Sequence, residues 1–273
     1  EDITVSIDGT GGTGTEGTDY GSLSDITISA GATTGTTTFT PTNDNMYETS
    51  TDETATVAID TVSGGSATEN GTQSVTITIN EDESAPTVTL AASGTSIAED
   101  SSSSITITAS LSGTTSQDVT VSLSSSSTAT EGTDYGTVSD ITISSGSTTG
   151  TATFTPTDDN LYETSTDETA TVSITGVSGG SATESGSQSV TLTIEENESA
   201  PTVTLSTSAT SIDENSGSVL TLTATLSVAT TADVTVTIAT SGSATEGTDY
   251  TDGSGNIDDL VITAGNTTET ISF

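Results

Sequence analysis

The sequence predicts an all-β protein made of tandem antiparallel sandwiches of about seven strands each. Apolar residues alternate with Thr or Ser along short segments throughout the chain, which is the pattern of strands with one buried face. The pentapeptide EGTDY also recurs at 16–20, 131–135 and 246–250, so that successive copies lie 115 residues apart. A fixed spacing of this kind indicates a repeated structural unit.

The middle repeat shows the alternating segments most completely. They lie at 87–90, 105–111, 119–123, 141–143, 152–154, 170–174 and 190–194. Glycines such as the pair Gly179 and Gly180 mark the turns between them. Seven short strands in roughly 100 residues, separated by regular turns, are typical of an immunoglobulin-like sandwich. We expect Phe154 and Tyr135 to be the bulkiest side chains of its core.

The repeats divide the chain into three domains, at residues 1–83, 86–198 and 201–273. The first begins at the equivalent of the third strand, because residues 2–6 match residues 118–122. The third ends at the equivalent of Phe154, so it lacks the last strands. We interpret the chain as a window of a longer array; strand exchange between subunits is the alternative.

The junctions between domains predict a stiff rod. Both have the sequence ESAPTV, at 83–88 and at 198–203. A proline in so short a linker restricts the backbone and gives a stiff joint rather than a flexible tether. Neighbouring repeats of the same chain are therefore expected partners of each domain.

Composition excludes several classes of function. The chain has 39 acidic residues and no Lys, Arg or His, which gives a formal charge of −39. Nucleic acids and anionic lipids require basic residues, so neither is an expected partner. The common general bases and nucleophiles are absent, and we expect no enzyme; a carboxylate-pair hydrolase is the remaining catalytic alternative. No apolar run could insert into a membrane, and the lack of Cys fits an extracellular, cell-surface protein.

Three acidic runs in the middle repeat predict a cation site. Loops at one end of a sandwich lie together, so the EGTDY loop, the loop after Phe154 and the end of the last strand can meet at one pole. Crowded carboxylates without a cation would repel one another by several kcal/mol, even at an effective dielectric of about 20. An oxygen-only set of ligands suits calcium or magnesium. The carboxylates in question are Asp134, Asp158, Asp159, Glu163, Glu195, Glu196 and Glu198.

Together these runs resemble the Calx-beta domain. The resemblance is carried by SIAED at 96–100, ATEGTDY at 129–135, DDNLYE at 158–163 and IEENE at 194–198. It covers the middle repeat and both partial ones, and it implies immunoglobulin-like sandwiches that bind calcium. The family is known from the regulatory region of sodium–calcium exchangers and from large bacterial surface and adhesion proteins.

The resemblance also implies a set of calcium ligands. In the middle repeat they are Glu99, Asp134, Asp158, Asp159, Glu163, Glu195, Glu196 and Glu198. In the first repeat they are Asp19, Asp44, Glu48, Glu81, Asp82 and Glu83, and in the third Glu214 and Asp249. The second acidic loop is longer than the family spacing, which favours Asp167 over Glu168. Asparagines within the acidic runs indicate weak sites, with dissociation constants of about 10⁻⁴ to 10⁻³ M.

We therefore expect a calcium-stiffened structural repeat of an extracellular rod, an adhesin stalk or a surface filament. Assembly of the chain into a homopolymer filament is one form that this function could take. A binding module for a glycan or a host protein is the main alternative, with Tyr20 and Tyr135 as stacking platforms. A calcium sensor is a further alternative.

Overall fold

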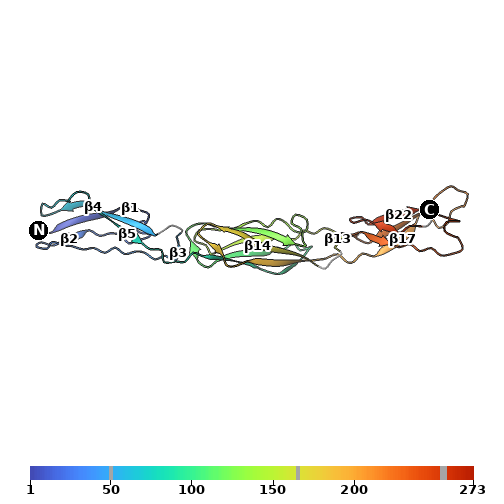
Figure 1. Ribbon diagram of the computed structural model, residues 1–273, viewed down its shortest axis with the longest axis horizontal. Coiled ribbons are helices and arrows are strands. Elements are labelled where there is room, and N and C mark those ends of the chain that lie inside the picture. The colour runs from blue at the N-terminus through green and yellow to red at the C-terminus, as the bar shows by residue number, and fades with distance from the viewer. Residues whose placement is uncertain (49–51, 164–166, 253–256) are drawn as a thin grey trace.

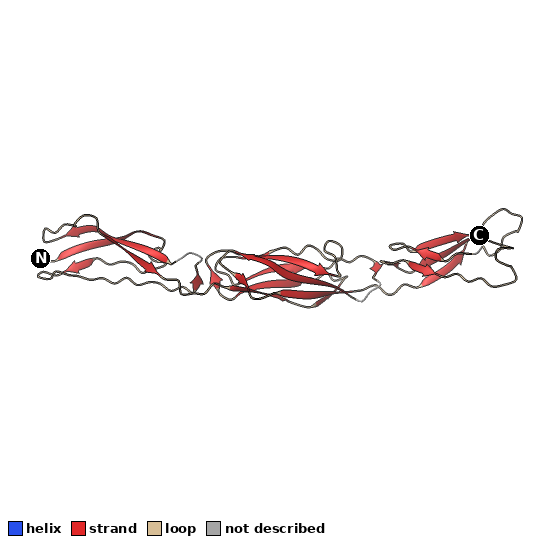
Figure 2. Cartoon of the chain, viewed as in Figure 1, coloured by secondary structure: helices blue, strands red, loops and turns tan. Residues whose placement is uncertain are grey.

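The computed structural model describes residues 1–48, 52–163, 167–252 and 257–273. All secondary-structure elements in these residues are strands, so the all-β prediction is confirmed. Three units follow one another along a single long axis, with the N-terminus at one end and the C-terminal unit at the other (Figure 1). Strands run mostly along this axis in each unit (Figure 2). No helix among the described residues is long and apolar enough to cross a membrane.

The middle unit consists of two sheets, with strand orders β11-β10-β14-β16-β7 and β12-β8-β6-β15. Its longer strands are β6 Thr87–Ala92, β8 Ile105–Leu111, β10 Val119–Ser127, β12 Thr149–Phe154, β14 Glu168–Ser178 and β16 Ser189–Glu195. Its shorter strands are β7 Ser96–Ala98, β11 Ile141–Ile143 and β15 Thr183–Glu184. Each of the seven segments expected from alternation forms a strand; β7 and β15 are additional, as are the two-residue strands β9 Thr114–Thr115 and β13 Leu161–Tyr162.

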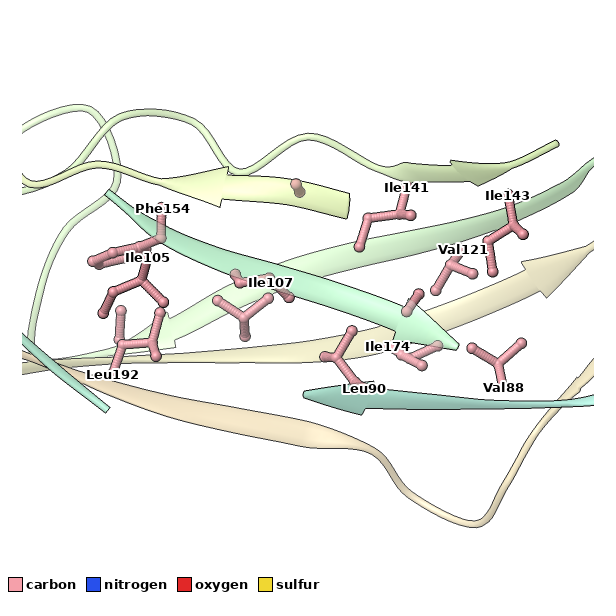
Figure 3. Packing of buried hydrophobic residues seen from close by; sticks show 14 of the residues in the cluster. Val88, Leu90, Ile105, Ile107, Val121, Ile141, Ile143, Phe154, Ile174 and Leu192 are labelled. Carbon is pink, nitrogen blue, oxygen red and sulfur yellow. The ribbon is translucent and has the colours of Figure 1, made fainter. Parts of the chain in front are cut away.

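The core of the middle unit lies between these sheets. Ile107 on β8 and Leu192 on β16 are fully buried, and their side chains lie in the space between the two sheets (Figure 3). Tyr135 is 1% exposed, and its ring stacks on Phe154 with centroids 4.7 Å apart. The EGTDY turn that positions this ring has a φ of 87° at Gly132, a conformation that glycine adopts without steric cost. The expected role of Tyr135 in the core is confirmed.

The first unit has one sheet, with the order β2-β1-β4-β5. Its strands are β1 Ile3–Gly12, β2 Ile26–Ile28, β4 Glu53–Ser63 and β5 Ser74–Ile79. This sheet corresponds to β11-β10-β14-β16 of the middle unit, and no described strand of the first unit corresponds to β6 or β8. As a result Val75 of β5 is 57% exposed, whereas its counterpart Val190 is partly buried.

The third unit has the complementary arrangement. Its strands are β17 Val203–Thr207, β18 Thr221–Leu226, β20 Val234–Val236, β21 Leu260–Ile262 and β22 Thr268–Ser272. The sheet β17-β18-β22 corresponds to β6-β8-β12, while β20 and β21 form a separate pair. Val203 and Leu205 are 44% and 54% exposed, although their counterparts Val88 and Leu90 are 0% and 8% exposed.

Two short parallel strand pairs join neighbouring units. β3 (Met46–Tyr47) pairs with β9 (Thr114–Thr115), and β13 (Leu161–Tyr162) pairs with β19 (Ala229–Thr230). In each pair the first strand belongs to the second acidic loop of one unit, and the second strand belongs to the next unit. The backbone therefore bridges both junctions directly.

Candidate metal centre

The closing acidic run of the middle unit anchors the candidate site. Glu196 follows the end of β16, and its carboxylate accepts N–H groups from Glu163 at 2.7 Å and from Glu198 at 2.9 Å. Burial raises the pKa of Glu196, but these backbone donors outweigh burial and hold the pKa below its ordinary value. Glu196 thus remains ionised and ties the closing run to the second acidic loop.

Glu99 lies at the centre of the site. β7 runs parallel to β16, and the N–H of Glu99 donates to the carbonyl of Glu195 at 3.0 Å. This pairing places the Glu99 side chain, which is only 5% exposed, among the other carboxylates. Two groups share it, each with oxygens within 4.8 Å of one another: Glu99 with Glu196 and Glu198, and Glu99 with Asp159 and Glu163.

The second acidic loop supplies Asp159 and Glu163. One oxygen of Asp159 accepts the N–H of Leu161 at 2.7 Å, a local turn that fixes the direction of its carboxylate. The pKa of Glu163 is raised to about 8, mainly by burial and next by the negative charge of Glu99. Burial and the charge of Asp159 raise the pKa of Glu99 to about 7. Both shifts show that these carboxylates are crowded with no positive side chain beside them.

The EGTDY loop and the start of β14 form the remaining side. Asp134 accepts the N–H of Thr130 at 2.6 Å, which closes the loop and directs it toward the pole. Burial, and next the charge of Asp134, raise the pKa of Glu168 to about 7. Glu168 therefore lies close to Asp134, and Asp167, which loop length favours, is exposed. Strand alternation could have identified Glu168, because it shares a face with the buried Ala170.

Several expected ligands of the middle repeat lie outside the two close groups. Glu195 is exposed, on the side of β16 opposite to the buried Ile194. Asp158 is also exposed. Among the described residues, neither carboxylate joins a group of three whose oxygens all lie within 4.8 Å of one another.

The first unit repeats the same construction. Glu81 accepts N–H groups from Glu48 at 2.6 Å and from Glu83 at 3.0 Å, as Glu196 does in the middle unit. Burial, and next the charge of Asp44, raise the pKa of Glu48 to about 7. A cavity of about 40 Å³ opens among the acidic side chains, which is room for a cation and water. Its lining includes all six expected residues, Asp19, Asp44, Glu48, Glu81, Asp82 and Glu83, together with Asp52 and Glu53.

The third unit has only part of the site. Asp249 accepts the N–H of Thr245 at 2.6 Å, so its loop has the same closure as that of Asp134. Glu214 and Asp249 are both exposed. In the part of the chain that the structure describes, neither joins a close carboxylate group.

These donor sets fit calcium. All of the clustered side chains offer oxygen, and the chain contains no His or Cys that would favour a transition metal. Calcium accepts six to eight oxygens in a flexible geometry, so it can bridge carboxylates from three loops. It would also remove the mutual repulsion that raises the pKa of Glu99 and Glu163.

Repeated sandwiches with acidic poles define a tandem β-sandwich protein with candidate cation sites. The Calx-beta domain family matches the chain over residues 1–83, 81–198 and 196–273. The chain therefore belongs to the Calx-beta family, as the acidic motifs indicated. A comparison with curated proteins finds no match.

Three solved structures illustrate the likeness, each at 16% sequence identity. The apo form of the Calx CBD1 domain covers 41% of this chain and is itself 98% covered, with a TM-score of 0.35. CBD12 from CALX1.2 matches over 68% of this chain and 74% of its own length, with a TM-score of 0.36. Invasin, described as a bacterial integrin-binding protein, matches over 99% of this chain and 46% of its own length, with a TM-score of 0.34.

Proposed function

We propose that this chain is a calcium-stiffened structural segment of an extracellular rod at the cell surface, such as an adhesin stalk or a surface filament. In the middle repeat, calcium is held by Glu99, Asp159, Glu163, Glu196 and Glu198, with Asp134 and Glu168 beside them. In the first repeat, Asp44, Glu48, Glu81, Asp82 and Glu83 serve the same purpose, with Asp19 and Glu53 beside them. Because the two groups of the middle repeat share Glu99, this pole has donors for two cations.

One observation carries the proposal: the segment that bears the site also bears the bridge to the next repeat. β13 lies between Asp159 and Glu163 in the sequence and pairs with β19 of the following unit. The carbonyl of Tyr162 accepts the N–H of Thr231 at 3.2 Å. A cation that fixes both carboxylates therefore also fixes the strand between them. Stiffness then passes from the site to the junction.

The first junction has the same construction. Asp44 and Glu48 flank β3, which pairs with β9 of the middle unit. The N–H of Ser116 donates to the carbonyl of Tyr47 at 3.1 Å. At both junctions, a strand within the second acidic loop of one unit pairs with the next unit. Calcium at each acidic loop would therefore stiffen both junctions in the same way, as a uniform rod requires.

The structure does not favour the glycan-binding alternative. Tyr20 and Tyr135 would have to present an open ring face to a sugar, but they are 3% and 1% exposed. Their rings stack on Phe39 and Phe154 instead. Membership of the Calx-beta family and the absence of the usual catalytic side chains also support a structural role over an enzymatic one.

Calcium removal tests the proposal. Chelation should lower the melting temperature, because a ligand that binds only the folded state stabilises it. It should also broaden the distribution of distances within the molecule that small-angle scattering measures, since the junctions loosen. Glu163→Gln should reproduce both effects in part, whereas Asp60→Asn, which removes an exposed carboxylate outside the site, should not. An unchanged melt and scattering profile after chelation would contradict the calcium assignment.

A further inference from the structure

Side chains distinguish the two junctions between units, although the strand pairing is the same at both. β3 and β13 lie at these junctions (Figure 1), and β3 has Met46 where β13 has Leu161. The partner strands differ as well, since Thr114 of β9 is replaced by Ala229 in β19. The first junction therefore has side-chain contacts that the second junction cannot make.

The side chain of Met46 reaches across the first junction. It is half-buried, and its terminal methyl group lies 3.9 Å from the position that a Cβ would occupy on Gly146. Gly146 belongs to a turn of the middle unit, and its N–H donates to the carbonyl of Thr115 at 2.9 Å. The thioether end of Met46 thus packs against the turn that supports β9.

The second junction has no equivalent of this contact. Gly265 occupies the place of Gly146, and its N–H donates to the carbonyl of Thr230 at 2.8 Å. Apart from its chain neighbours, no described residue has an atom within 4 Å of a Cβ built on Gly265. The shorter side chain of Leu161 therefore does not reach this turn.

A hydroxyl group adds a second contact at the first junction. The O–H of Thr114 donates to the carbonyl of Asn45 at 3.0 Å, directly before Met46 in the sequence. Ala229 has no hydroxyl with which to make this bond in the second junction. Met46 and Thr114 are opposite each other in the parallel pair, so the side chains of both strands contact the neighbouring unit.

Met46 is also the only residue of the chain that contains sulfur, because the sequence has one Met and no Cys. Oxidation of a thioether to a sulfoxide makes an apolar side chain polar and disrupts its packing. We propose that Met46 is a modification site at which a peroxide oxidises the sulfur and releases the contact between the first and middle units. The first junction then bends more freely, and the second junction does not change.

The reaction is an oxygen transfer. A lone pair of the Met46 sulfur attacks one oxygen of hydrogen peroxide, an S–O bond forms while the O–O bond breaks, and water leaves after a proton shift. The sulfur loses two electrons and the peroxide gains them, so hydrogen peroxide is the only co-reactant. Leu161 has no lone pair to offer, and peroxide leaves it unchanged.

The surroundings of Met46 disfavour a sulfoxide at the contact. Two hydrogen-bond donors beside it are already used, because the O–H of Thr114 and the N–H of Gly146 each donate to a backbone carbonyl. The chain also has no Lys, Arg or His that could donate to the new oxygen. Since a polar group without a partner is costly to bury, the oxidised side chain should turn toward water and leave the turn.

Peroxide treatment of the full chain is the first test. Peptide mass spectrometry should show one added oxygen, at Met46, under conditions that oxidise free methionine. The maximum dimension in small-angle scattering should shorten, and it should recover when methionine sulfoxide reductases for both epimers restore the thioether. An unmodified Met46, or a fully oxidised chain that scatters as before, would overturn the proposal.

Met46→Leu is the matched control, because it gives the first junction the residue that the second junction has. The variant cannot form a sulfoxide, so its scattering should be the same before and after peroxide treatment. A response equal to that of the wild type would show that the bend does not originate at Met46, and would also overturn the proposal.

Distances between spin labels locate the bend. The chain has no Cys, so labels at Asp8→Cys and Ser124→Cys span only the first junction, and labels at Ser124→Cys and Thr235→Cys span only the second; all three positions are exposed. Met46→Gln places a polar oxygen near the position of the sulfoxide without an oxidant that could attack the labels. It should broaden the distances of the first pair alone. Broadening of both pairs, or of neither, would contradict the inference.

The outcome is separable from that of the calcium proposal, because these measurements are made in chelator. A chain that bends on oxidation supports the role of Met46 whether or not the acidic poles bind calcium. Calcium binding by calorimetry, together with a junction that does not respond to oxidation, would overturn this inference alone.

Discussion

Glu168 and Glu195 lie at the ends of neighbouring strands, and strand alternation decides which way each side chain points. Glu168 is two residues before the buried Ala170 and therefore faces the inside of the sandwich pole. Glu195 directly follows the buried Ile194 and faces outward. Comparison of loop lengths had favoured Asp167, and only the period of the strand distinguishes it from Glu168.

Neutralising Glu163 should have opposite effects with and without calcium. Its pKa of about 8 shows that its ionised form is disfavoured in the folded state. Without calcium, Glu163→Gln should raise the unfolding free energy at pH 9 by on the order of 1 kcal/mol, a value discounted for solvent screening. With calcium, the same change should reduce stabilisation by the metal. Denaturant titrations in chelator and in calcium measure both effects, and a loss of stability in chelator would contradict the assignment.

Replacing Asp134 should affect one repeat only. Its carboxylate lies beside Glu168 and also closes the EGTDY loop through the N–H of Thr130 at 2.6 Å. Asp134→Ala should therefore weaken calcium binding in the middle repeat by roughly 1.5–3 kcal/mol, the range for an interaction made by a charged group. The first repeat, with Asp19 in the same position, should keep its affinity. Calorimetry that shows unchanged stoichiometry and affinity would contradict this role.

β6, β8, β10, β14 and β16 are long enough for their period to appear in the sequence, so alternation predicts them and the faces that they bury. β13 and β19 have two residues each, too few for any period. They exist because the second acidic loop meets the next unit, a contact that no local pattern encodes. The carboxylate pole could be predicted for the same reason as the long strands, because loops at one end of a sandwich converge. The bridge between units could not.

The bridge can be broken without touching the acidic side chains. Thr231→Pro removes the N–H that donates to the carbonyl of Tyr162. We expect the second junction to bend more freely, with a shorter maximum dimension in small-angle scattering, and the middle unit to melt as before. Thr231→Ala keeps the N–H and is the matched control. If both variants scatter like the wild type, the bridge does not stiffen the junction.

The molecule is a row of units, and among the described residues only the middle unit has a complete sandwich core. Its buried cluster draws on both sheets, whereas the described core of the third unit consists of Ala224, Leu226, Leu260 and Ile262 with a few partly buried neighbours. The formal charge of −39 acts along the entire row and favours an extended shape, since every unit repels the next. Under the proposed function, cations and the backbone bridges hold such a row in a defined geometry.

Stability should accordingly fall as pH rises when calcium is absent. The folded state raises the pKa of Glu163 to about 8 and those of Glu48, Glu99 and Glu168 to about 7, from an ordinary value of 4.5. Between pH 4.5 and about 8 the folded chain thus binds more protons than the unfolded chain, and its unfolding free energy declines across this window.

Calcium bound as proposed would occupy the same oxygens as these protons and should cancel the decline. Melting temperatures at pH 5, 7 and 9, each in chelator and in calcium, measure the effect. The melting temperatures in chelator and in calcium should be equal near pH 5, where protons neutralise the carboxylates of the poles. They should differ most at pH 9, where only calcium can neutralise these carboxylates. Sodium chloride added to the chelated protein is the control for general screening, which should recover a smaller part of the loss because partly buried charges are screened less. Parallel curves would show that the acidic poles are not the groups that titrate.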